Sequence, residues 1–126
     1  MKTILVDAVN TFVVDGKINT DMKAMLDSFP NRKIIVTNAN DQEKIKYWLV
    51  DMPYIVFTLS HNPNKPDPKY FTTLLDKYAL HPSQVVYFEH NPAAVMSAKL
   101  VWIASYHYDH IKKDIHAVKE FIAQNI

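Results

Sequence analysis

Cysteine is absent from the 126-residue sequence, and glycine occurs only once, at Gly16. Without cysteine there is no disulfide framework, no cysteine-ligated zinc site and no thiol nucleophile. A single glycine excludes the glycine-rich phosphate loops of dinucleotide-binding and P-loop proteins. Left-handed turn positions must then fall to other residues, and we expect asparagine and aspartate, which tolerate that conformation. The asparagines in segments predicted to be loops are Asn10, Asn31, Asn38, Asn40, Asn62, Asn64 and Asn91.

Strong charge of either sign and long apolar runs are missing as well. The formal net charge is +1, which gives no reason to expect nucleic acid or an anionic membrane surface as a partner. No apolar stretch approaches the roughly 20 residues that span a bilayer. The first residues contain one lysine and meet an acid at Asp7, which is not the pattern of a signal peptide. We therefore expect a cytoplasmic protein without a membrane partner.

Hydrophobic residues make up 48% of the sequence, so we expect one globular domain over residues 1–126. Short apolar runs rich in β-branched residues predict strands at residues 4–6, 33–37, 54–59, 83–88 and 101–104. Helical spacing predicts helices at residues 21–28, 41–50, 68–78, 92–99 and 109–124, and Asp15-Gly16 predicts a hairpin turn. This alternation predicts an α/β fold, with a mainly parallel five-stranded sheet covered by helices on both faces.

Four polar residues lie where predicted strands end or shortly beyond: Asp7, Thr37, Lys65 and Glu89. The carboxyl ends of parallel strands meet at one edge of a sheet, and open α/β sheets bind ligands there. A hydroxyl and a lysine can hold phosphoryl oxygens, and two carboxylates can hold Mg²⁺. The sequence therefore indicates a combined site for a phosphate group and a cation.

Each of the four also has an ordinary structural interpretation. Asp7 could cap a turn at the end of its strand, and Thr37 could bond its hydroxyl to nearby backbone. Lys65 could be a solvated loop lysine. Glu89 could interact with the dipole of the helix after Pro92, a role that is compatible with metal binding. Only their common position at strand ends favours a shared site.

Four motifs resemble those of the haloacid dehalogenase-like (HAD) superfamily, over essentially the whole chain. The first is an apolar strand followed by DAVNT at residues 7–11, where the family has Asp-x-Asp-x-Thr, and then a hairpin. The second is the strand KIIVT, which ends at Thr37 and precedes Asn38. The third is KPDP at residues 65–68, and the fourth is VVYFEHNPAAVMSAK, whose strand ends at Glu89. The chain is similar to a minimal, capless member with a degenerate first motif.

The resemblance implies a three-layer α/β/α, Rossmann-like fold with strand order 5-4-1-2-3 and no cap domain. It implies that Asp7 is the nucleophile, forming an aspartyl-phosphate, and that Lys65 is the second catalytic residue. The phosphate-binding residues that it implies are Thr37, Asn38 and Lys65. The implied Mg²⁺ ligands are the carboxylates of Asp7 and Glu89 and the backbone carbonyl of Val9. The expected partner is a phosphorylated substrate.

Two departures from the family pattern bear on activity. Val9 stands where the family's phosphatases have an acid that acts as general acid and base. Valine cannot transfer a proton, and such a group typically contributes about 10²–10⁴-fold in rate. In the fourth motif, Glu89 is followed by His90 and Asn91 rather than by a second acid, and nothing in the sequence places His90 near a leaving group. We therefore expect weak Mg²⁺-dependent phosphate-ester hydrolysis or, alternatively, an inactive HAD-like domain that binds a phosphorylated ligand or a protein partner.

The missing cap bears on the remaining activities of the superfamily. Dehalogenases and phosphonatases lack an acid at the Val9 position but use residues on a cap domain. The segments between Thr11 and Thr37 and between Thr37 and Lys65 leave no room for one. In the family, an open, capless site accompanies large substrates or closure by a neighbouring subunit, so a homo-oligomer is a further expectation.

Other histidines and aromatic residues have structural interpretations. His107 and His110 could share a helix face as metal ligands, but a helix beginning at Asp109 would leave His107 outside it. Trp48 and Trp102 are expected in or at the edge of the core, because no basic stripe accompanies them as in nucleic-acid-binding proteins.

Overall fold

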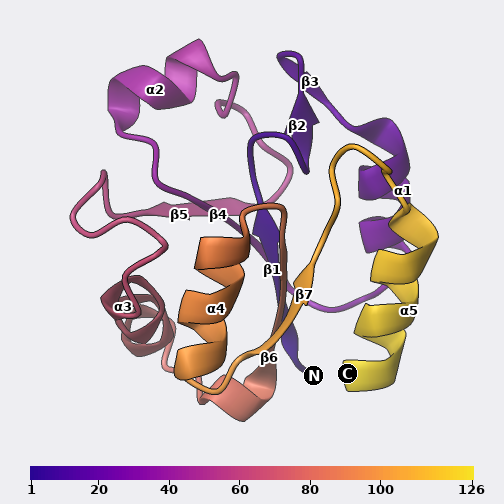
Figure 1. The fold of residues 1–126 in the computed structure, drawn as a ribbon. Coiled ribbons are helices and arrows are strands. Elements are labelled where there is room, and N and C mark those ends of the chain that lie inside the picture. Colours follow the sequence, from indigo (N-terminus) through magenta and orange to yellow (C-terminus); the bar gives the residue numbers. More distant parts are fainter.

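The computed structural model describes residues 1–126 and has a parallel sheet between two layers of helices (Figure 1). The sheet order is β5-β4-β1-β6-β7, with all neighbours parallel. The strands are β1 (Thr3–Asp7), β4 (Lys33–Thr37), β5 (Ile55–Thr58), β6 (Val85–Glu89) and β7 (Ala104–His107). This is the predicted order, counted from the opposite edge. The α/β fold class is confirmed.

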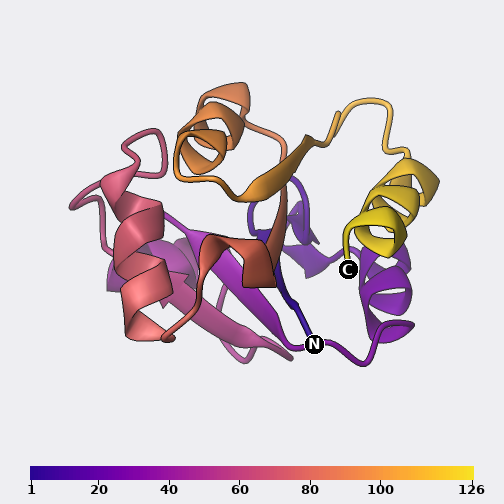
Figure 2. The same cartoon turned by 90° about the horizontal axis from the view of Figure 1, so that it is seen from below.

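The helices form the outer layers (Figure 2). Helices α1 (Thr20–Asp27) and α5 (Ile115–Asn125) pack on one face of the sheet. Helices α3 (Lys69–Lys77) and α4 (Pro92–Leu100) pack on the other. A short 3₁₀ helix, η1 (Pro82–Gln84), leads into β6. None of the helices combines the length and the apolar character that a bilayer-spanning helix needs.

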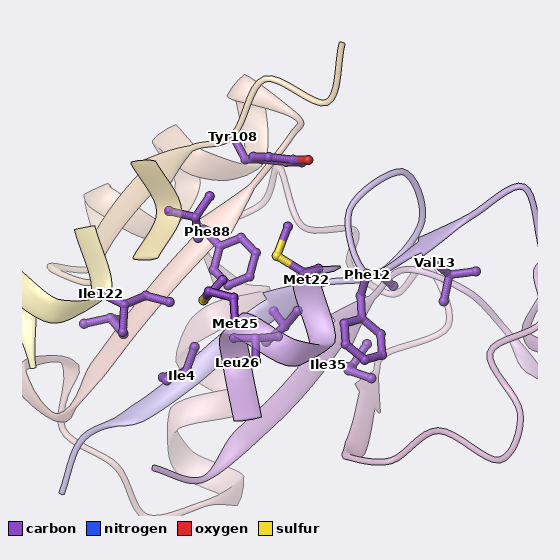
Figure 3. Close-up of a cluster of buried hydrophobic side chains, with 14 of the residues drawn as sticks. Ile4, Phe12, Val13, Met22, Met25, Leu26, Ile35, Phe88, Tyr108 and Ile122 are labelled. Atoms are coloured by element: carbon purple, nitrogen blue, oxygen red, sulfur yellow. The ribbon is translucent and has the colours of Figure 1, made fainter. Parts of the chain in front are cut away.

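The central strands send alternate side chains into two apolar cores, because successive residues of a strand point to opposite faces. On β1, Ile4 and Val6 lie in the core beneath α1 and α5, and Leu5 lies in the core beneath α3 and α4. Figure 3 shows the first of these cores, which gathers Ile4, Leu26 of α1 and Phe88 of β6. Burial on both faces accounts for the uninterrupted apolar runs in the sequence.

Two smaller elements lie at the carboxyl ends of the strands (Figure 1): the hairpin of β2 (Val13–Val14) and β3 (Lys17–Ile18), and helix α2 (Asp41–Lys46). The hairpin turns at Asp15-Gly16, as predicted. Gly16 has a φ of 73°, and a Cβ there would lie 2.8 Å from Cδ1 of Trp48. The single glycine therefore stands where both the backbone conformation and the contact exclude a side chain.

Three asparagines act as helix caps. The side chains of Asn19, Asn40 and Asn91 accept hydrogen bonds from backbone N–H groups at the starts of α1, α2 and α4. Asn10, Asp15 and Asp51 have positive φ, as expected for asparagine and aspartate. The expectation missed the other non-glycine residues with positive φ, which are Trp48, Ser60, His61, Ala79, Trp102 and Lys113.

Helix α2 and strand β7 differ from their predicted bounds. Helix α2 ends at Lys46 rather than at residue 50, because Trp48 has a φ of 60° and cannot continue the helix. Strand β7 begins at Ala104 rather than at residue 101, because Trp102, with a φ of 70°, lies in the turn that ends α4.

Helix α5 begins at Ile115, six residues later than predicted. Asp109 does cap a turn, accepting from the N–H groups of residues 111 and 112, but Lys113 has a φ of 56° and interrupts the helical path. Asp114 then caps α5 itself. His107 lies in β7 and His110 in the turn, so the two do not share a helix face.

Four large apolar side chains expected inside are mainly exposed: Ile45, Trp48, Trp102 and Ile111, at 67%, 62%, 85% and 77%. They lie in or beside the segments whose bounds differ. The helices predicted at residues 41–50 and 109–124 are shorter in the structure, so Trp48 and Ile111 lie outside them. Leu49, from the same predicted helix as Ile45, is buried as expected.

Truncation of Leu26 tests the core beneath α1 and α5. Leu26 is fully buried, so Leu26→Ala should lower the free energy of unfolding by about 3 kcal/mol, the usual range for a buried leucine. Leu100→Ala is the matched control, because Leu100 is 67% exposed and should change stability by less than about 0.5 kcal/mol. Urea unfolding measures both. Equal losses in the two variants would contradict the assignment of this core.

Candidate functional site

A polar cleft of about 440 Å³ lies at the carboxyl ends of β1, β4 and β6. Its lining includes every residue predicted for the site: Asp7, Val9, Thr37, Asn38, Lys65 and Glu89. It also includes residues that were not predicted: Asn10, Ala39, Glu43, Tyr47, His61, His90 and Asn91. The structure thus brings the predicted residues to one place, and their chemical roles stay predictions.

The sheet register brings the two acids together. Strands β1 and β6 are neighbours, with Val6 opposite Phe88. The next residue on each strand is therefore Asp7 on one and Glu89 on the other, side by side at the switch point where the strand order reverses. Both side chains are buried, at 1% and 0% exposure.

Lys65 joins the two carboxylates. Its Nζ lies 2.8 Å from Oδ1 of Asp7 and 2.6 Å from Oε1 of Glu89, and the residue is only 6% exposed. Lys65 comes from the loop between β5 and α3, and Asn38 holds that loop in place by accepting the Lys65 backbone N–H at 2.7 Å. An ammonium group shared by two buried carboxylates offsets much of the penalty of burying them.

Further donors satisfy the carboxylate oxygens. The hydroxyl of Thr11 donates to Oδ2 of Asp7 at 2.7 Å. The hydroxyl of Tyr87 donates to Oε1 of Glu89, and the backbone N–H of Asn91 donates to Oε2 at 3.1 Å. Tyr87 was not predicted as part of the site, although its position two residues before Glu89 puts both on the same face of β6.

Thr37 lies at the end of β4 and is 5% exposed. Its Oγ1 accepts the backbone N–H of Ala39 at 3.2 Å, and its carbonyl accepts the hydroxyl of Tyr70 at 2.8 Å. A threonine hydroxyl that accepts one bond still has its own proton to donate. Thr37 can therefore donate to a phosphoryl oxygen in the cleft.

His90 is the main residue that sequence reasoning did not place. Its ring Nδ1 contacts Oδ2 of Asp7 and lies 3.2 Å from Oε2 of Glu89. Its backbone N–H also donates to Oδ2 of Asp7, at 3.2 Å. The only sequence signal was its place directly after Glu89, which could not show that its ring turns toward Asp7.

Burial and charge shift the pKa values of these groups in different directions. Burial would raise the pKa of Asp7, but Lys65 and the hydrogen bond from His90 outweigh it and hold that pKa well below its usual range. Burial and the neighbouring Asp7 raise the pKa of Glu89. Burial would lower the pKa of Lys65, but the two carboxylates raise it. Hydrogen bonds to Asp7 and Glu89 raise the pKa of His90 to about 9.

Asp7, Glu89 and His90 each bring one ligand atom to within 4.8 Å of the others, a spacing that suits a metal ion. Two carboxylates are the oxygen donors that Mg²⁺ prefers. The imidazole nitrogen is not a typical Mg²⁺ ligand, and its presence distinguishes this cluster from an all-oxygen site.

No protein-family model and no curated protein matches the sequence. Solved structures match the fold. A mutant HAD family enzyme from Bacteroides thetaiotaomicron, in complex with magnesium and inorganic phosphate, superposes with a TM-score of 0.73 at 12% identity, covering 93% of this chain and 98% of that one. An uncharacterized protein from Corynebacterium glutamicum superposes with a TM-score of 0.64 at 15% sequence identity. The match covers 98% of this chain and 96% of that one.

Larger HAD-superfamily proteins match this chain over part of their own length. A HAD-superfamily hydrolase of subfamily IA from Geobacter sulfurreducens gives a TM-score of 0.57 at 18% identity, covering 73% of this chain and 47% of that one. The chain thus spans about half the length of this hydrolase. At such identities the likeness shows the fold alone. The protein has the HAD-like fold, which confirms the predicted resemblance at the level of architecture.

Replacement of His90 should change how stability depends on pH. The pKa of His90 is about 9 in the folded protein, against about 6.5 in an unfolded chain. Its contribution is therefore complete below about pH 6.5 and is lost as the pH rises toward 9. His90→Asn should remove this loss, up to about 3 kcal/mol, as measured by urea unfolding at about pH 6 and pH 9.

The control for this measurement is His116→Asn, because the His116 side chain is 78% exposed and contacts only Glu120 among the charged groups. It should keep the pH dependence of the unmodified protein. If His90→Asn also keeps it, the ion pair between His90 and the two carboxylates does not form in solution.

Proposed function

We propose that the protein acts on phosphate esters, with Asp7 as the nucleophile of a phosphoryl-transfer site. The observation that carries this proposal is the buried Asp7–Lys65–Glu89 arrangement at the base of a polar cleft, with Asp7 held ionised. A carboxylate must be ionised to attack phosphorus. The phosphate bound to a HAD family enzyme of the same fold also supports it.

The chemistry would run in two steps. A carboxylate oxygen of Asp7 attacks the phosphorus, and the bond from phosphorus to the ester oxygen breaks. This leaves an acyl phosphate on Asp7 and an alkoxide, which takes a proton from water to become the alcohol. Water then attacks that phosphorus and releases phosphate and the free carboxylate. Lys65 and the hydroxyl of Thr37 can donate hydrogen bonds to phosphoryl oxygens, which stabilises the charge that develops on them.

Proton transfer to the leaving group is the weak point of this site. Val9 lines the cleft where an acid would be needed, and its side chain has no proton to give. Without a general acid, the rate is expected to fall by about 10²–10⁴-fold. We therefore propose slow hydrolysis.

Mg²⁺ is the cofactor that the resemblance to the superfamily implies for this site. Asp7 and Glu89 offer the carboxylate oxygens that suit this ion, and the resemblance assigns a third ligand, the backbone carbonyl of Val9. When bound, such an ion supplies positive charge that offsets the negative charge of a phosphoryl group.

A second candidate is an inactive domain that binds a phosphorylated ligand or a protein partner. The observation that favours it is that every carboxylate oxygen of Asp7 and Glu89 already accepts at least one hydrogen bond. A fully bonded carboxylate is a poorer nucleophile, and Val9 removes the proton donor.

Beryllium fluoride, which mimics the phosphoryl group on a carboxylate, tests the nucleophile. The unmodified protein should bind it, as seen by fluorine NMR, and Asp7→Asn should not, because the amide oxygen cannot coordinate beryllium in the same way. Asp41→Asn is the matched control, because the Asp41 side chain is 97% exposed. Binding should be measured with and without Mg²⁺. Equal binding by Asp7→Asn and the unmodified protein would contradict the role of Asp7.

A Val9→Asp variant separates the two candidate functions. It restores a proton donor at the cleft, so hydrolysis of an aryl phosphate with Mg²⁺ present should rise by roughly 10²-fold. Val14→Asp, on the hairpin outside this cleft, is the control and should show no rise. A folded Val9→Asp protein without any gain would favour the inactive, ligand-binding alternative.

A further inference from the structure

The ring of His90 lies between the two carboxylates on the side that Lys65 leaves free. Lys65 bonds Oδ1 of Asp7 and Oε1 of Glu89. His90 Nδ1 contacts the other two oxygens, Oδ2 of Asp7 and Oε2 of Glu89. Asp7 is ionised and can only accept, so Nδ1 carries a hydrogen and donates it. Lys65 therefore contacts one oxygen of each carboxylate, and His90 contacts the other oxygen of each.

The position of His90 is fixed from several directions. Its backbone N–H donates to Oδ2 of Asp7 at 3.2 Å, and its carbonyl accepts Nε2–H of His107 at 2.9 Å. The ring of His110 packs edge-on against the His90 ring, with 5.0 Å between centroids. The His90 side chain is 23% exposed, so part of it still reaches the cleft. These contacts hold the His90 backbone and ring in one position beside the two carboxylates.

Donors already occupy the place of an ion between the two carboxylates. Lys65 donates to Oδ1 of Asp7 and Oε1 of Glu89, and His90 Nδ1 contacts Oδ2 of Asp7 and Oε2 of Glu89. A divalent cation that bridged the same carboxylates would have to displace the His90 ring from Oδ2 and Oε2. It would then lie close to the Lys65 ammonium group, which repels it.

We propose that the His90 side chain takes the place of a divalent cation between Asp7 and Glu89, so that the site binds a phosphoryl group without a metal ion. This inference rests on the proposed phosphoryl site, and in it a residue of the chain takes the place of the Mg²⁺ that the resemblance implies. The phosphoryl group would then meet two donor side chains, Lys65 and His90.

Mg²⁺ binding, measured by isothermal titration calorimetry, tests the inference without any activity. The unmodified protein should show little Mg²⁺ binding. His90→Asp, which removes the ring and adds an oxygen ligand, should bind Mg²⁺ at least about tenfold more tightly. His116→Asp, at an exposed histidine, is the matched control and should behave like the unmodified protein. If the unmodified protein and His90→Asp bind Mg²⁺ equally, or neither binds it, the inference is wrong.

His90→Asn provides a second test, because it removes the ring without adding a negative charge beside Asp7 and Glu89. Circular dichroism checks that each variant is folded. His90→Asn should also bind Mg²⁺ more tightly than the unmodified protein. An unchanged affinity in a folded His90→Asn protein would mean that the ring does not keep the ion out.

Beryllium fluoride binding in the presence of EDTA separates this inference from the proposed function. The unmodified protein should keep its binding when EDTA removes divalent ions other than beryllium, and His90→Asn should lose most of it. Binding that appears only with Mg²⁺ would overturn the inference and leave the phosphoryl site standing. Binding under neither condition would overturn the phosphoryl site, and the Mg²⁺ titrations would still decide whether His90 excludes the ion.

Discussion

The ion pair that Lys65 makes with Asp7 and Glu89 is the interaction on which the site depends. Two carboxylates at the ends of neighbouring buried strands would repel each other strongly in a region with little water. Lys65, itself almost fully buried, lies within 2.8 Å of both. Loss of the ammonium would leave two uncompensated buried charges. The loop of Lys65 is therefore part of the folded core as well as of the site.

A second layer of donors completes this polar network. Thr11, Tyr87 and Asn91 each donate to one of the carboxylates, and His90 donates to both. Such a network is stable only when all of its members are satisfied, since an unpaired buried polar group is costly. The same hydrogen bonds hold the carboxylates in fixed orientations, which a phosphoryl site needs.

The fold was predictable where local pattern and tertiary packing agree. Strands β1, β4 and β6 are buried on both faces, so their apolar runs were unambiguous. The predictions failed at α2, β7 and α5, where Trp48, Trp102 and Lys113 take positive φ values in a chain that has one glycine. Such conformations are unusual for these residue types, and no local signal in the sequence marks them. The strand order came from the resemblance to a known superfamily rather than from periodicity.

The sequence by itself determined that Asp7, Thr37 and Glu89 would lie together, because parallel strands bring their carboxyl ends to one edge of the sheet. The resemblance to the superfamily also pointed to Lys65, through its KPDP context. Only the tertiary structure decided that His90 would share both carboxylates. His90 and Asp7 are 83 residues apart. Their contact requires the β1–β6 register, and the contacts of His107 with the His90 carbonyl and of His110 with the His90 ring. No spacing along the chain encodes such an orientation, because it arises from packing between segments that are distant in sequence.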